Sequence, residues 1–310
     1  MRLSIVGRVI LAAAAGIAVA LLVDRADTSL FAGLVEVALP WMPLLLLLEG
    51  GRIAADLVAL RSLCGPAARS LSAWQWIRLH LVANAALVVL PGGRAVSEAM
   101  KVDRLRGALG TGRAVTLVVA LHTTTLAAVA CTSVVAVVAG MLLAGSTALL
   151  AALLAHAAVC VGSAIALRAA LARATVPRRL ARWLRSETLL ADVRSSAQTL
   201  PPIPRAAMAA KLVNRGLQVA VFAVVLHALT PPAHAGHALF ANGLSMLGGI
   251  AGEFTPAQLG ATDGVLAASA SSLSVALAVA LALASVVRIS QVVWSAVGGA
   301  LALAPRREGR

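Results

Sequence analysis

The stretch LPGGRAVSEA at residues 90–99 is matched in outline by TPAQLGATDG at residues 255–264. In both stretches a proline follows or interrupts an apolar run, and a carboxylate lies seven positions after it. Each stretch leads into a long apolar segment with one titratable residue near its middle. These residues are Pro91, Glu98 and His122 in the first case, and Pro256, Asp263 and Arg288 in the second. Broken segments at corresponding places in two halves of a membrane protein are typical of transport sites.

The composition predicts an integral membrane protein. Hydrophobic residues make up 60% of the 310 residues and charged residues only 12%, which is more apolar side chain than a soluble domain of this size buries. Aromatic residues are scarce at 3%, and the many small residues favour close helix packing within lipid. The sequence therefore predicts an all-α, polytopic membrane protein in which residues 1–310 form a single transmembrane domain.

The formal net charge of +14 also fits a membrane location. The basic residues lie in loops beside apolar spans, a pattern explained by positive-inside orientation and by contact with anionic lipid. We therefore expect no nucleic-acid partner. The three cysteines are widely separated and form no CxxC pair, so neither a disulfide framework nor a zinc site is indicated.

Hydropathy and charge together predict six crossings, with both termini in the cytoplasm. The strongest topological signal is the segment 168–215, which holds ten basic and two acidic residues and is expected on the cytoplasmic side. Within it, residues 172–204 are predicted to form an amphipathic basic segment on the inner leaflet. No lysine or arginine occurs in residues 230–287, as expected of an external face. The expected spans are 9–23, which we take as a retained first helix, 33–48, 114–143, 147–167, 212–229 and 274–303.

Two further apolar pieces, at residues 77–90 and 238–250, are shorter than the roughly 20 residues that a bilayer crossing needs. Helix-breaking residues follow each piece, so we predict two re-entrant hairpins. Residues 1–145 and 146–310 then share one order of span, span, hairpin and span, begun from opposite sides, which is an inverted repeat. The predicted hairpin breaks are Pro91, Gly92 and Gly93 in the first half, and Pro256 and Gly260 in the second.

The two stretches resemble the signatures of a known family. LPGGRAVSEAMKVDRLRG, at residues 90–107, and TPAQLGATDG are similar to motifs of the flippase-like membrane domain of lysylphosphatidylglycerol synthases and its stand-alone relatives. Lys101 and His122 stand where the family commonly has arginine, and Asp263 stands where it usually has glutamate. Because no soluble domain follows the last span, the resemblance implies lipid translocation without the aminoacyltransferase reaction. Some stand-alone relatives are associated with hopanoid and polyprenyl-lipid pathways.

Five residues are candidate substrate ligands, and each also has a plainer interpretation. Arg288 lies mid-span, where a charged side chain costs at least ~2.5 kcal/mol, so its partner is either a nearby carboxylate or a headgroup phosphate. Glu98 and Asp263 are either dipole partners of a restarting helix, or ligands and proton carriers for a headgroup. His122 either hydrogen-bonds to a neighbouring helix or contacts the headgroup. Lys101 belongs either to a solvated positive edge or to a site for anionic lipid.

The sequence contains no catalytic motif and no metal-ligand spacing, so no catalytic residue, metal or cofactor is predicted. We predict a lipid transporter of the flippase type that moves a phospholipid or a polyprenyl- or hopanoid-type lipid between the leaflets of a bacterial-type inner membrane. The alternatives are a membrane-embedded enzyme of lipid-linked glycan or lipid modification, and a scaffold for a lipid-modifying partner. Membrane lipids are the expected partners, together with lipid-biosynthesis proteins.

Overall fold

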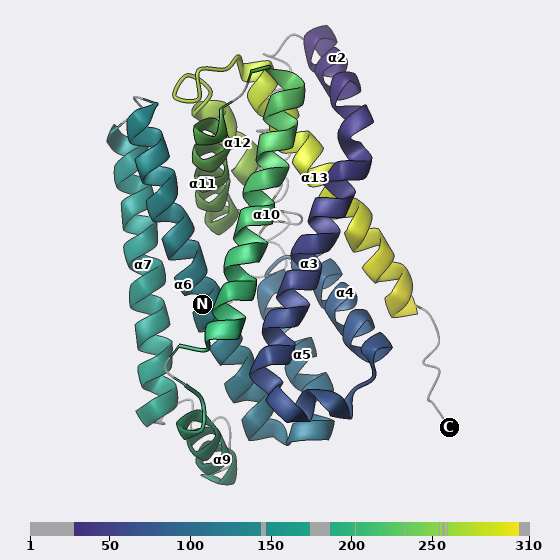
Figure 1. Ribbon diagram of the computed structural model, residues 1–310, viewed down its shortest axis with the longest axis vertical. Helices are drawn as coiled ribbons and strands as arrows, with labels where there is room; N and C mark the ends of the chain where they lie inside the picture. Colours follow the sequence, from purple (N-terminus) through teal and green to yellow (C-terminus); the bar gives the residue numbers. More distant parts are fainter. Residues whose placement is uncertain are drawn as a thin grey trace.

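The structure is a computed structural model, and it describes residues 28–143, 147–173, 187–201, 203–232, 234–253, 255, 258 and 260–303. All regular secondary structure in these residues is helical, which confirms the predicted all-α fold (Figure 1). Within the described residues, five helical stretches are long and apolar enough to cross a membrane, as expected of a multi-pass protein. They are Ala32–Ser70, Thr111–Leu142, Thr147–Ala172, Arg205–Leu229 and Leu277–Leu303. Each overlaps an expected span, and the remaining expected span, 9–23, lies outside the described residues.

The helices fall into a long group and a short group. The longest helix has 32 residues, whereas two consecutive pairs of short helices lie where hairpins are predicted. The elements are α2 (Thr28–Ala38), η1 (Leu39–Trp41), α3 (Met42–Cys64), η2 (Gly65–Ser70), α4 (Ala73–Val89), α5 (Gly93–Leu109), α6 (Thr111–Leu142), α7 (Thr147–Arg173), α9 (Glu187–Gln198), α10 (Arg205–Leu229), α11 (Ala235–Ala251), α12 (Ala261–Ala268) and α13 (Leu277–Leu303). The short pairs are α4–α5 and α11–α12.

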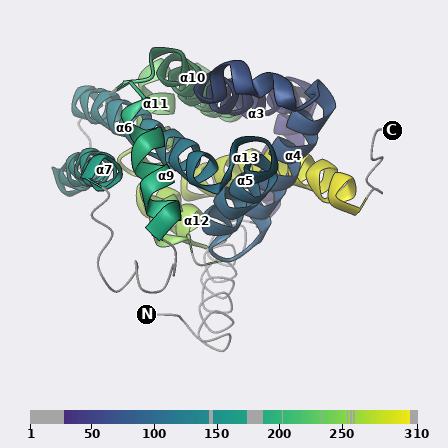
Figure 2. The ribbon, with the colours of Figure 1, turned by 90° about the horizontal axis from the view of Figure 1, so that it is seen from below.

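The two short pairs occupy opposite ends of the bundle. Figure 1 shows α4 and α5 in the lower half of the molecule, and α11 and α12 in the upper half. Within each pair the two helices pack against one another. The turns of the two pairs meet, since the Gly92 amide donates a hydrogen bond to the Glu253 carbonyl oxygen at 3.0 Å. Viewed from below in Figure 2, α3 and α10 lie side by side along one edge of the bundle.

The turn between α4 and α5 follows from local chain chemistry. Leu90 has extended backbone, with ψ of 141°, as is typical of a residue that precedes proline, here Pro91. Gly92 then has φ of +65°, a conformation that costs glycine little. Gly93 begins α5 so close to α4 that an added Cβ would lie 2.2 Å from the Ala86 carbonyl oxygen. These residues therefore allow the two helices to turn back in contact.

The turn between α11 and α12 reaches the same result with different residues. Gly260 has φ of +81°, and its amide donates a hydrogen bond to Asp263 Oδ2 at 2.9 Å, which starts α12. A Cβ added at Gly248 would lie 2.5 Å from the Thr262 Cα, so α11 and α12 also pack closely. Pro256, the predicted break, lies outside the described residues.

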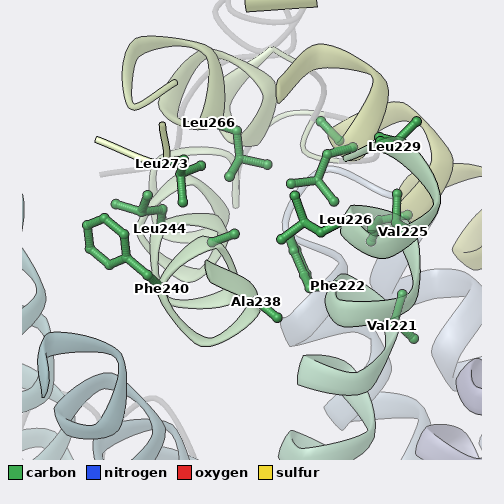
Figure 3. Close-up of a cluster of buried hydrophobic side chains, with 14 of the residues drawn as sticks. Val221, Phe222, Val225, Leu226, Leu229, Ala238, Phe240, Leu244, Leu266 and Leu273 are labelled. Atoms are coloured by element: carbon green, nitrogen blue, oxygen red, sulfur yellow. The ribbon is translucent and has the colours of Figure 1, made fainter. Parts of the chain in front are cut away.

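Two clusters of buried apolar side chains lie toward opposite ends of the long helices. Part of the first apolar cluster is shown in Figure 3, and the whole cluster joins α2, α3, α6, α7, α10, α11, α12 and α13. Its members include Phe222, Leu226, Phe240, Leu244 and Leu266. The second apolar cluster joins α3, α4, α5, α6 and α10, and includes Leu60, Trp76, Leu105, Leu117 and Ala207. Helices α3, α6 and α10 each contribute residues to both clusters. On each of these helices, the polar residues between the two apolar sets therefore lie in the middle of the bundle.

Two helices extend past the expected span boundaries. The second span is expected to end at residue 48, but α3 continues to Cys64, and the fifth is expected to begin at residue 212, but α10 begins at Arg205. In both cases charged residues that are predicted to leave the membrane instead continue the helix. One physical reason is that Asp56 of α3 is hydrogen-bonded to Lys211 of α10, so these two charges are accommodated between helices rather than in loops.

The predicted basic segment 172–204 is partly described. Residues 187–198 form α9, which packs against α6 and α7, and residues 174–186 lie outside the described residues. A hydrogen bond from Thr116 Oγ1 of α6 to the Val193 carbonyl oxygen, at 3.3 Å, fixes α9 to the bundle.

Candidate functional site

A cavity of about 490 Å³ lies in the middle of the bundle, with walls formed by α3, α4, α5, α6, α7, α10, α11, α12 and α13. Leu87, Val88 and Arg94, which lie on either side of the first turn, contribute to it, as do Glu253 and Gln258 of the second turn. Of the five predicted ligand residues, four line the cavity, and the fifth, Asp263, is bonded to one of them. The charged side chains that line it are Arg52, Asp56, Arg94, Glu98, Lys101, Lys211, Arg215, Glu253 and Arg288.

Arg288 is paired with a carboxylate. Its Nη2 donates a hydrogen bond to Asp263 Oδ1 at 2.8 Å, while Asp263 Oδ2 accepts the Gly260 amide. The side chains of Arg288 and Asp263 are only 15% and 8% exposed. Asp263 therefore acts both as the helix cap of α12 and as the counter-ion of a mid-bundle arginine.

His122 and Glu98 form a second pair. His122 Nδ1 lies 2.8 Å from Glu98 Oε1, and both side chains line the cavity while remaining partly exposed to it. The plainer interpretation of His122, a contact to a neighbouring helix, thus describes its bonding, because α5 carries Glu98 and packs against α6. The pair also remains accessible to any molecule that enters the cavity.

The turns of the two short helix pairs are joined by a third ion pair. Arg94 Nε lies 3.1 Å from Glu253 Oε1, beside the backbone hydrogen bond from Gly92 to Glu253. Both side chains line the cavity, and both are more than one-third exposed. This contact closes one side of the cavity where α5 starts and α11 ends.

Lys101 is not part of a solvated edge. It is half-buried and lines the cavity, whereas Arg104 and Arg106 on the same helix are exposed. Arg106 pairs with Asp103 at 2.8 Å on the outer face of α5. The structure therefore separates Lys101 from the two arginines with which the sequence groups it.

Sequence reasoning missed the charges of α3 and α10. Lys211 Nζ donates a hydrogen bond to Asp56 Oδ1 at 2.8 Å, and the Lys211 side chain is 5% exposed. Asn214 Nδ2 donates to the Arg52 carbonyl oxygen at 2.8 Å, and Arg52 Nε donates to Glu49 Oε2 at 2.9 Å. Together these contacts form a polar seam between α3 and α10 that continues into the cavity wall.

A helical pattern was available to find this seam. The polar residues of α3 and α10 recur at intervals of three, four and seven positions, which places each set on one helix face. They are Glu49, Arg52 and Asp56 on α3, and Lys211, Asn214, Arg215 and Gln218 on α10. The pattern was overlooked because positive charge near a predicted span end is normally assigned to the loop.

The cavity combines charge with apolar walls. Six arginine and lysine side chains line it against three acidic ones, and the apolar lining includes Leu121, Val129, Phe222 and Ile250. Its volume is in the range of sites for small ligands or headgroups. Within the described residues, no group of three or more His, Cys, Asp or Glu side chains is placed to hold a metal ion. The arrangement suits an amphiphile with a polar, negatively charged end.

Comparison with known proteins gives one match. A family model described as "Lysylphosphatidylglycerol synthase TM region" matches residues 5–299, which is nearly the whole chain. No curated protein and no solved structure matches the chain. The match covers both broken stretches and every helix that contributes to the cavity, apart from the last residues of α13.

Proposed function

The chain belongs to the lysylphosphatidylglycerol synthase TM region family, and from that premise we propose that it moves a lipid between the two leaflets of a bacterial-type inner membrane. The substrate class is a phospholipid or a polyprenyl- or hopanoid-type lipid. The observation that carries the proposal is the charged cavity between two apolar clusters. Charged groups inside a membrane are costly unless they are paired or line a polar path, so such a cavity marks a substrate pathway.

The proposal treats α4–α5 and α11–α12 as re-entrant hairpins of an inverted repeat. Helices α4, α5 and α11 have 17 residues each and α12 has eight, all shorter than a typical span. Their position at opposite ends of the bundle, with touching turns, supports entry from opposite membrane surfaces. Irregular backbone at membrane depth is tolerated where it borders a polar cavity, as the second turn does here at Glu253 and Gln258.

In this scheme a lipid headgroup occupies the cavity while its acyl chains remain in the bilayer. Breaking the Arg94–Glu253 contact would separate the hairpin turns and open the cavity toward one surface, and restoring it would close that side. Both side chains are partly exposed, so the pair can open at small free-energy cost, about 0–1 kcal/mol for a solvated ion pair. The scheme assumes that both termini are cytoplasmic, and it includes no chemical step.

Reconstitution in liposomes tests the proposal. Fluorescent lipids in the inner leaflet become accessible to an external quencher only when they are moved outward, so quenching measures transport. We expect transport with the wild-type protein and at least a tenfold slower rate with Arg288→Ala. Arg205→Gln is the matched control because Arg205 is exposed on α10. If wild-type protein moves none of the lipid classes named above, or if it alters them chemically, the proposal fails and the enzyme alternative is favoured.

A further inference from the structure

Two cations that line the cavity differ from the others. Among the described residues, Arg52, Arg94, Lys211 and Arg288 each have a carboxylate partner, whereas no carboxylate lies within ion-pair distance of Lys101 or Arg215. Lys101 projects into the cavity from α5 and Arg215 from α10. The two side chains therefore bring uncompensated positive charge to the cavity from helices that are far apart in sequence.

Nearby acidic residues do not compensate this charge. Lys101 interacts electrostatically with Asp56 and Glu98, and Arg215 also interacts with Asp56. Asp56 is already hydrogen-bonded to Lys211, and Glu98 is paired with His122. The carboxylates near the two cations are thus engaged elsewhere.

Arg215 uses only part of its hydrogen-bonding capacity. Arg215 Nη1 donates to Gln218 Oε1 at 2.7 Å, but Arg215 Nε is buried and has no hydrogen-bond partner among the described residues. A buried donor of this kind is costly unless an acceptor reaches it.

We propose that Lys101 and Arg215 form a binding site for a phosphate group, either a monoester or a diester. Phosphate offers several acceptor oxygens and no obligatory donor, which matches cationic donors arriving from two helices. The arginine fork binds two oxygens at once and the lysine ammonium adds a point charge. The inference rests on the proposed function and deepens it, because it narrows the transported lipid to one that carries phosphate. It also assigns headgroup binding to Lys101 and Arg215 rather than to Arg288, whose charge Asp263 balances.

Native mass spectrometry of the full-length protein in detergent tests the site. Three probes are compared: short-chain phosphatidic acid, diacylglycerol with the same acyl chains, and inorganic phosphate. The test variants are Lys101→Gln and Arg215→Gln. Arg104→Gln on α5 and Arg205→Gln on α10 are the matched controls, because both arginines are exposed on the same two helices. Arg215→Lys keeps the positive charge but removes the forked guanidinium group. Thermal unfolding of every variant checks that it is folded.

We expect phosphatidic acid to bind, and each glutamine variant of the site to weaken this binding about tenfold while the controls leave it unchanged. Arg215→Lys should lie between wild type and Arg215→Gln. Binding of phosphatidic acid without inorganic phosphate assigns the site to a lipid headgroup, and binding of both probes assigns it to phosphate itself. Equal binding of diacylglycerol and phosphatidic acid, or equal loss in test and control variants, overturns the inference.

The proposed function and this site can fail separately. If phosphatidic acid binds through Lys101 and Arg215 but no lipid moves in liposomes, the phosphate site is supported and the proposed transport is contradicted. If the protein in liposomes moves a phosphate-free lipid at the same rate as phosphatidic acid, the proposed transport is supported and the phosphate site is contradicted.

Discussion

The two short helix pairs have similar sequence patterns and different chemistry. In α5, Arg94, Glu98 and Lys101 recur at intervals of four and three positions, so they share one helix face and line the cavity. In α12 only Thr262 and Leu266 line it, while the single charged residue turns away to cap the helix and hold Arg288. The charged residues of α5 thus line the cavity, whereas the charged residue of α12 has a structural role.

The difference arises from where each helix starts. Asp263 is the third residue of α12, so its carboxylate reaches the Gly260 amide at the helix start. Glu98 is the sixth residue of α5, one turn beyond capping distance, and it meets His122 instead. Equal spacing from a proline therefore does not give two carboxylates equal roles, because the proline is not at an equal distance from the first residue of the helix.

The largest expected effect is a difference in stability between variants of the two carboxylates, Asp263 and Glu98. Asp263→Ala should lower the free energy of unfolding by about 3–5 kcal/mol, because it leaves a largely buried arginine without its counter-ion. Glu98→Gln should lower it by less than ~1 kcal/mol, because the pair that it breaks is partly exposed. Reversible unfolding in mixed detergent micelles measures both. Equal losses would contradict the division between a structural carboxylate at Asp263 and a cavity-lining carboxylate at Glu98.

A double-mutant cycle sharpens this result. Combining Asp263→Ala with Arg288→Ala removes both charges, so the loss should be smaller than the sum of the single losses by about 1–3 kcal/mol. If the losses of the two single variants simply add in the double variant, the two residues are not energetically coupled in the detergent-solubilised protein.

The next effect concerns the feature that the two pairs share, which is close helix contact. Gly93→Ala and Gly248→Ala should each cost about 1–3 kcal/mol of stability, because the added Cβ would meet backbone atoms at 2.2 and 2.5 Å. Gly107→Ala and Gly264→Ala are the controls, since nothing lies within 4 Å of a Cβ built at either position. A loss of stability at only one of the two positions would show that the two helix pairs are not structurally equivalent.

Transport should respond to Glu98 more than stability does. Glu98→Gln keeps the size of the side chain but removes the negative charge that pairs with His122 in the cavity. We expect the rate of lipid movement in liposomes to fall about tenfold, equivalent to about 1.4 kcal/mol. Glu36→Gln, on α2 and away from the cavity lining, is the control. An unchanged rate of lipid movement would show that Glu98 is not part of the proposed site.

The smallest expected effect is at the contact between the turns. Arg94→Gln breaks an ion pair whose side chains are 42% and 34% exposed, so the free energy of unfolding should change by less than ~1 kcal/mol. The change should shrink as salt is raised, because exposed ion pairs are screened. Unfolding at low and high ionic strength measures it, and a large loss that does not depend on salt would mean that this contact is structural.

Sequence patterns located much of the fold and part of the cavity. The all-α membrane fold and the family are confirmed, and both short helix pairs lie where hairpins are expected. Glu98, Lys101, His122 and Arg288 line one cavity, and their role as ligands stays a prediction. The polar seam between α3 and α10 was missed because a rule based on charge near span ends assigned its residues to loops.

The sequence by itself determined the class of protein and the places where helices break. Hydropathy, proline and glycine act through solvent preference and local backbone geometry, so neighbouring residues suffice to show their effect. Only the tertiary structure decided which charges meet. Asp56 and Lys211 are 155 positions apart, and Asp263 lies next to Arg288 although Glu98 has the same spacing from its proline. Such pairs depend on how helices are rotated and packed against one another, which is a long-range property that no local pattern contains.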